Sequence, residues 1–127
     1  MATTHMALGV VATLVIIFVV PFVVYAGLSE FAGLDPPEGT PLTFLTGVFV
    51  SKVGTALAFV LIFYLARHDL SGRWIAYAFL WWLMYAIGEI GQAIGPGYSW
   101  KEAVAGIISE TIYFPASAWV VNRLLAG

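Results

Sequence analysis

The stretch "ALGVVATLVIIFVVPFVVYAGL", residues 7–28, contains no charged side chain. A helix rises 1.5 Å per residue, so about 20 residues cross the roughly 30 Å hydrocarbon core of a bilayer. The stretch lacks the apolar–polar alternation of a membrane β-barrel strand. A cleaved signal peptide is the alternative interpretation, but no basic segment precedes the run and its apolar part is longer than usual. The stretch therefore predicts a transmembrane helix.

Three further apolar runs follow, at residues 43–66, 74–94 and 103–125. Of the 127 residues, 61% are hydrophobic and 9% are charged, whereas soluble domains contain about 25% charged residues. The sequence therefore predicts an all-α integral membrane protein with four transmembrane helices, forming one domain over residues 1–127.

Short polar connections join these runs, so we expect neighbouring helices to pack antiparallel in an up-down-up-down bundle. Lys and Arg near helix ends favour the cytoplasmic side of a membrane. In this arrangement Arg67, Arg73 and Arg123 share one side with both termini, and the opposite side holds Lys101 and the acidic segment 29–41. We therefore expect both termini to be cytoplasmic, in a multi-pass protein of a plasma membrane or a bacterial inner membrane.

Three of the runs each contain ionisable residues near the outer end of the helix. They are Lys52 in "GVFVSKVGTA", Glu89 in "AIGEIGQAI" and Glu110 in "GIISETIYFP". Their distances from the helix ends place all three roughly 8–14 Å below the outer boundary. A charge at the helix centre costs about 2.5–3.5 kcal/mol to insert, so these groups should face the bundle interior. We expect Lys52 to pair with one glutamate, and the other to be protonated or neutralised by a bound cation.

Helical spacing adds other polar groups to this layer. Tyr85 and Gln92 share a helix face with Glu89, and Tyr113 lies three residues after Glu110. Residues three or four apart are neighbours on a helix surface. These six residues form the predicted site, either for a ligand or ion, or as a structural ion-pair network.

Small residues form two stripes that favour close helix packing. Gly47, Ser51 and Thr55 form one stripe beside the lysine, and Gly91 and Gly95 form a GxxxG motif. The simplest interpretation of both stripes is helix–helix contact.

Several functional classes are disfavoured by composition. The chain has no cysteine, so it has no thiol redox chemistry and no thiolate metal site. Its two histidines, His5 and His68, lie outside the central parts of the runs, where a haem-binding bundle needs its ligands. The net charge of −2 gives no basis for nucleic-acid binding. We therefore expect neither cofactor nor metal, and the lipid bilayer as the main environment.

Three functions remain open. The first is a proton- or cation-linked transporter or channel, acting as a homo-oligomer, in which the glutamates bind the proton or cation. The second is an accessory subunit of a larger membrane complex. The third is a membrane-embedded enzyme acting on a lipid or isoprenoid, with Trp81, Trp82 and Tyr85 stabilising a cationic intermediate. No nucleophile, metal or phosphate motif supports the enzyme.

Overall fold

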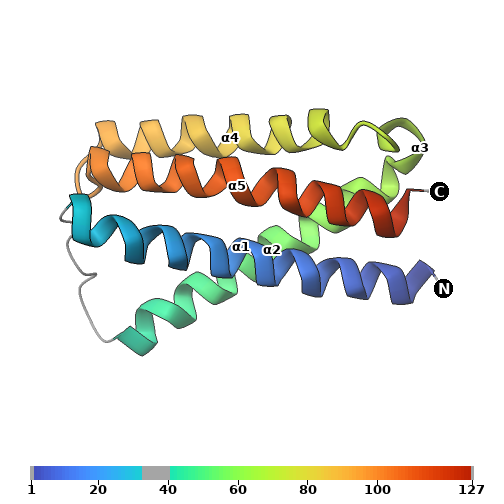
Figure 1. Ribbon diagram of the computed structural model, residues 1–127, viewed down its shortest axis with the longest axis horizontal. Coiled ribbons are helices and arrows are strands. Elements are labelled where there is room, and N and C mark those ends of the chain that lie inside the picture. The colour runs from blue at the N-terminus through green and yellow to red at the C-terminus, as the bar shows by residue number, and fades with distance from the viewer. Residues whose placement is uncertain (1, 33–40, 127) are drawn as a thin grey trace.

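The computed structural model describes residues 2–32 and 41–126, which form α-helices and contain no strand. The helices are α1 (Ala2–Ala32), α2 (Pro41–Leu65), α3 (Arg67–Leu70), α4 (Trp74–Ile94) and α5 (Trp100–Leu125). Among them α1, α2, α4 and α5 are long and apolar enough to cross a membrane (Figure 1). The prediction of an all-helical chain with four candidate spans is confirmed.

The helix ends differ slightly from the sequence prediction. Helix α4 has the predicted bounds, α1 extends past both ends of 7–28, and the connection 67–73 contains the short helix α3. Helix α5 begins at Trp100 because the Ser99 hydroxyl accepts a hydrogen bond of 3.0 Å from the backbone N–H of Glu102. This is an N-cap, and the Ser-x-x-Glu pattern is its sequence signature. Part of the acidic connection, residues 33–40, lies outside the described residues.

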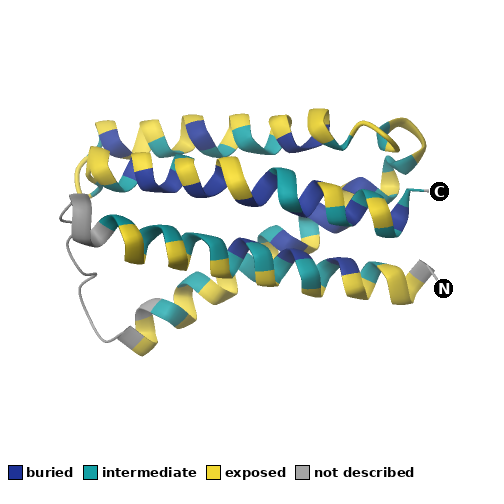
Figure 2. Cartoon of the chain, in the orientation of Figure 1, coloured by how far each residue is buried: buried dark blue, intermediate teal, exposed yellow. Residues whose placement is uncertain are grey.

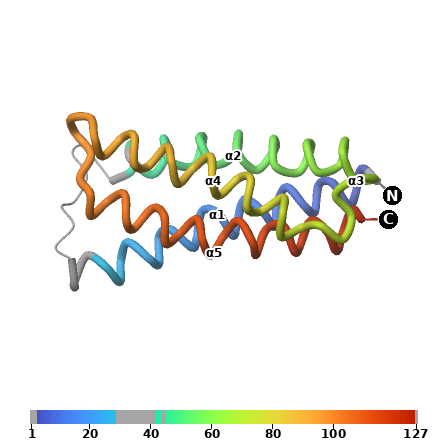
Figure 3. The backbone as a smooth tube through the Cα atoms, turned by 90° about the horizontal axis from the view of Figure 1, so that it is seen from above, coloured from blue at the N-terminus to red at the C-terminus, as the bar shows by residue number. Residues whose placement is uncertain are grey.

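Helix α5 lies between α1 and α4 and packs along both of them (Figure 1). It is the most buried of the four long helices (Figure 2). Helix α2 packs mainly on α1 and lies on the far side of the bundle in Figure 1, as the view from above makes clear (Figure 3). Both ends of the chain lie at one end of the molecule, here called the terminal end. The opposite end carries the connection 95–99 and is called the 95–99 end.

An aromatic cluster joins α2 to α4 and α5. The ring of Phe59 lies 4.8 Å from that of Tyr77, 5.4 Å from that of Trp81 and 5.9 Å from that of Phe114, measured between centroids. The hydroxyl of Tyr77 also donates a hydrogen bond to the Phe59 carbonyl. Lipid tails are as apolar as the core, so packing and hydrogen bonds of this kind hold membrane helices together.

The first half of α2 diverges from α4 and α5 (Figure 1). Its side chains, including Val50 at 65% exposure, are largely uncovered, while Phe49 keeps an edge-on ring contact of 5.8 Å with Phe18 of α1. The second half contains the buried residues Phe59 and Phe63. Helix α2 is therefore held in the bundle mainly along its second half.

The Tyr77 hydroxyl supplies a testable link between α2 and α4. We expect Tyr77→Phe to lower the free energy of unfolding by about 1 kcal/mol, since it removes one interhelical hydrogen bond and keeps the ring. The measurement is detergent unfolding followed by circular dichroism. Tyr64→Phe is the control. Tyr64 contacts the Arg67 guanidinium with its ring, at 4.1 Å from the centroid, and phenylalanine keeps that ring. Equal losses in the two variants would contradict this role of the hydroxyl.

Candidate functional site

A cavity of about 60 Å³ lies between the four long helices, toward the 95–99 end. Helix α5 lines it with one face, through Gly106, Ser109, Glu110 and Tyr113. The other helices contribute Pro21 and Tyr25 from α1, Lys52 from α2 and Glu89 from α4. The three ionisable residues that the sequence places in one layer therefore line the same cavity.

The two carboxyl groups of the cavity are paired with each other. The side chain of Glu110 is 2% exposed, and its carboxyl group lies against that of Glu89. Two ionised carboxylates in contact repel each other, so a shared proton would stabilise the pair. The Oε1 atom of Glu110 is buried, and it accepts no hydrogen bond from the described residues. A buried polar atom of this kind indicates a missing water or ion.

Gly106 makes room for this carboxyl pair. A Cβ atom built on Gly106 would lie 2.5 Å from both Cδ and Oε1 of Glu89 and 2.7 Å from Oε2. No side chain can replace the glycine unless the carboxyl group moves. The Glu89 carboxyl thus packs directly on the backbone of α5, next to Glu110.

Lys52 does not form the ion pair with a glutamate that the sequence analysis expects. Among the described residues its ammonium group contacts Tyr113 instead, donating to the hydroxyl at 3.4 Å and lying 4.9 Å from the ring centroid. An ammonium is attracted to the face of an aromatic ring. The lysine therefore adds a positive charge to the cavity without binding either carboxyl directly.

Tyr98 is a site residue that the sequence analysis missed. Its hydroxyl donates a hydrogen bond to Oε2 of Glu89 and lies 3.4 Å from the Glu102 carbonyl. Burial raises the pKa of Tyr98 above its ordinary value, and the hydrogen bond to Glu89 raises it further. The turn that brings Tyr98 back over Glu89 includes Gly97, whose φ of 86° favours glycine. The Gly-Pro-Gly sequence signals this turn, but not the contact.

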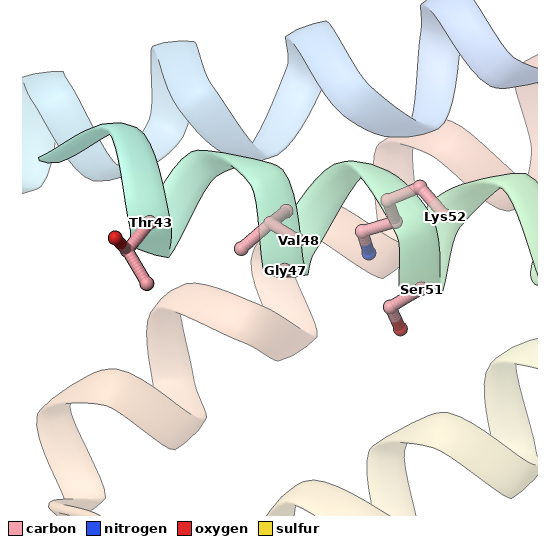
Figure 4. A pocket seen from close by; sticks show the side chains of 5 residues that line it. All are labelled: Thr43, Gly47, Val48, Ser51 and Lys52. Atoms are coloured by element: carbon pink, nitrogen blue, oxygen red, sulfur yellow. The ribbon is translucent and has the colours of Figure 1, made fainter.

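A second, open space of about 460 Å³ adjoins the cavity along the first half of α2. Thr43, Gly47, Val48, Ser51 and Lys52 line it, and Figure 4 shows these side chains on α2 facing the gap beside α4 and α5. Here this space is called the α2 groove. Lys52 is the residue that lines both the groove and the cavity.

The other predicted site residues lie outside the cavity. Tyr85 shares a hydrogen bond of 2.8 Å with Thr55 on α2, and its ring packs on Phe114 at 4.9 Å. Gln92 is exposed on α4. The structure thus brings together Lys52, Glu89, Glu110 and Tyr113, and it places Tyr85 and Gln92 elsewhere.

The tryptophans considered for an enzyme also lie away from the cavity. Trp81 belongs to the aromatic cluster around Phe59, and the Trp82 ring nitrogen donates to the Thr111 hydroxyl at 2.9 Å. Both therefore serve contacts between α4 and its neighbours.

Two further buried hydroxyls lie nearer to the terminal end than Glu110 does. Ser117 lies two turns after Glu110 on α5, and Thr13 lies on α1. Both are fully buried, and neither hydroxyl has a hydrogen-bond partner among the described residues. Together with the Glu110 oxygen, they leave three buried polar atoms that water could satisfy.

Within residues 2–32 and 41–126, no group of three His, Cys, Asp or Glu side chains is arranged to hold a metal ion. No family model matches the chain, and no curated protein or solved structure is significantly similar to it.

The fit of Glu89 against Gly106 can be tested directly. We expect Gly106→Ala to displace the carboxyl group and to lower the free energy of unfolding by about 1–3 kcal/mol. Gly91→Ala is the matched control on α4, because a Cβ there meets nothing within 4 Å. It should leave stability unchanged or raise it by up to about 1 kcal/mol, because alanine has the higher helix propensity. Equal unfolding curves for both variants would show that the carboxyl does not occupy this position.

Proposed function

We propose that this chain is a proton-linked transporter or channel of a membrane, in which Glu89 and Glu110 hold the transported or coupling proton. The observation that carries the proposal is that two carboxyl groups line one cavity between four apolar helices, and that a buried oxygen of Glu110 accepts no hydrogen bond from the described residues. Ionisable residues at membrane depth are expensive to insert, and they typically mark ion or proton pathways.

The size of the cavity supports a proton as the occupant. Its volume of about 60 Å³ corresponds to about two water molecules at roughly 30 Å³ each. That space is large enough for a hydrated proton. A metal cation is disfavoured by the Lys52 ammonium, which lines the same small cavity and would repel it.

Lys52 supplies a competing charge that can couple protonation to structure. When the carboxyl pair loses its proton, its negative charge increases and it attracts the ammonium more strongly. When the pair is protonated, contact with the Tyr113 ring and hydroxyl becomes the better alternative for Lys52. A protonation event thereby favours one position of α2 over another.

A transport path also needs a continuation toward the terminal end. The orphaned hydroxyls of Ser117 and Thr13 are candidates, because buried polar groups bind ordered water when room allows. A chain of such waters would extend the polar line beyond Glu110.

The proposal includes an orientation in the membrane. The four helices would form an up-down-up-down antiparallel bundle, with both termini in the cytoplasm and the 95–99 end outside. The arginines of positions 67, 73 and 123 support it, because basic residues favour the cytoplasmic side. The membrane would be a plasma membrane or a bacterial inner membrane.

Glu110→Gln is the main test. We expect this variant to reduce proton flux to the level of empty vesicles, because an amide of similar size cannot bind and release the proton. Flux is measured with a pH-sensitive dye enclosed in proteoliposomes under an imposed potassium diffusion potential. Infrared difference spectra should show a protonated-carboxyl band in the wild type that is lost in the variant. Asp69→Asn is the control, because Asp69 is exposed on α3.

A purely structural role for the charges predicts a different pattern. Removing one partner of a buried charged set leaves the other uncompensated, so each single neutralisation should destabilise the bundle. Replacing Lys52 and Glu110 together by Met should then restore stability. A double variant that retained wild-type proton flux would refute the transport proposal.

A second candidate function, accessory subunit of a larger membrane complex, is favoured by one observation. Gly47 and Gly54 on α2, and Gly88 and Gly91 on α4, have only open space around their Cβ positions. The exposed Gln92 lies close to the α4 glycines in sequence. Small residues allow close approach of another helix, and polar side chains hydrogen-bond across such interfaces.

Native mass spectrometry of the particle extracted in nanodiscs distinguishes these assemblies. We expect a homo-oligomer without other proteins, since a transporter needs no further subunit. Stoichiometric co-purification of larger subunits would support the accessory role instead. The corresponding interface test is Gly91→Leu, which should dissociate the oligomer because a bulky side chain prevents close helix contact.

A further inference from the structure

The Glu89–Glu110 pair is connected to the 95–99 end by a single tyrosine. The Tyr98 hydroxyl donates to Glu89 Oε2, and the residue itself lies in the connection between α4 and α5, half-buried. On the proposed proton-linked function, we infer that Tyr98 relays protons between the carboxyl pair and the water at the 95–99 end. It would be the entry point of the path on that side.

The position of Tyr98 carries this inference. The residue lies between the spans Trp74–Ile94 and Trp100–Leu125, whereas Glu89 lies within the first of them. Its hydroxyl meets the Tyr25 hydroxyl and lies 3.4 Å from the Glu102 carbonyl. Tyr25 also donates to that carbonyl, at 3.2 Å. The Tyr98 hydroxyl is therefore placed among polar groups between the carboxyl pair and the end of the bundle.

The chemistry needs no group beyond water. A hydronium ion at the 95–99 end gives a proton to the Tyr98 oxygen while the Tyr98 proton passes to Oε2 of Glu89. The hydronium becomes water, the tyrosine is neutral before and after, and the carboxylate becomes a carboxylic acid. Once Glu89 has passed this proton on toward Glu110, rotation of the hydroxyl restores the starting hydrogen bond. The raised pKa of Tyr98 supports this route, because the residue stays neutral and carries protons by exchange.

The groups around the relay are contributed by every long helix. Tyr25 of α1 touches it, and Lys52 of α2 and Glu89 of α4 line the cavity beneath it. Helix α5 contributes Glu102 and Glu110. Of these, only Glu89 is joined to Tyr98 by a hydrogen bond to a carboxyl oxygen. A proton from Tyr98 would therefore reach the carboxyl pair through Glu89. Tyr25 lies next to the Tyr98 hydroxyl.

Tyr98→Phe tests the relay in proteoliposomes containing the enclosed pH dye. This variant keeps the ring and removes the exchangeable proton, so we expect proton flux to fall about tenfold or more. The infrared band of the protonated carboxyl at low pH should keep its wild-type amplitude, because protons still reach the pair slowly. A merely structural role would lower the band and the flux together. Flux equal to or above the wild-type rate overturns the inference.

A matched pair of glycine variants provides a second test in case Tyr98→Phe does not fold. Gly97 and Gly72 both have positive φ, 86° and 78°, and a Cβ on either meets nothing within 4 Å. Alanine strains both turns similarly, but only Gly97→Ala displaces the neighbouring Tyr98. We expect Gly97→Ala to slow proton flux and Gly72→Ala to leave it unchanged; equal flux in both overturns the relay.

The two proposals fail in different ways. If the wild-type protein produces no proton flux and shows no titrating carboxyl band, the proton-linked function is wrong. The Tyr98 relay is then wrong as well. If wild-type flux depends on Glu110 but is unaffected by Tyr98→Phe, the function stands and the relay is wrong.

Discussion

A carboxyl group inside a bilayer has no water to bind, so its hydrogen-bond partners must come from the protein. Glu110 meets this constraint by pairing with Glu89, and the pair exists only because Gly106 leaves space for the second carboxyl. Tyr98 then satisfies the outer oxygen of Glu89. The cavity and its tyrosines are thus organised around the two carboxyl groups of Glu89 and Glu110.

The sequence was sufficient to predict the helices and the charged layer. An uncharged run that is long enough, as a helix, to cross a bilayer permits few other structures. The similar depths of Lys52, Glu89 and Glu110 follow from counting residues to the helix ends. These features depend on position along the chain alone. The start of α5 at Trp100 was not predicted: the Ser-x-x-Glu cap that begins at position 99 places it three residues before the predicted run 103–125.

The contacts within the layer could not be predicted in the same way. They depend on the rotation of each helix about its axis, and a helix that is apolar on all sides gives little indication of that rotation. Tyr85 and Gln92 share a helix face with Glu89 by spacing, but Tyr85 turns toward Thr55 and Gln92 is exposed. The contact of Tyr98 with Glu89 depends in addition on the geometry of the turn at Gly97.

Helix α2 has the mechanical character of a lever, because it is fixed at Phe59 by the aromatic cluster and diverges from α4 and α5 toward Pro41. A rigid helix can pivot about its fixed part without disturbing the packing there. At 1.5 Å per residue, a tilt of about 10° moves Pro41 by about 5 Å and Lys52 by about 2 Å. A displacement of that size is enough to make or break a contact of the lysine ammonium, so a small tilt of α2 about Phe59 would change the charge that lines the cavity.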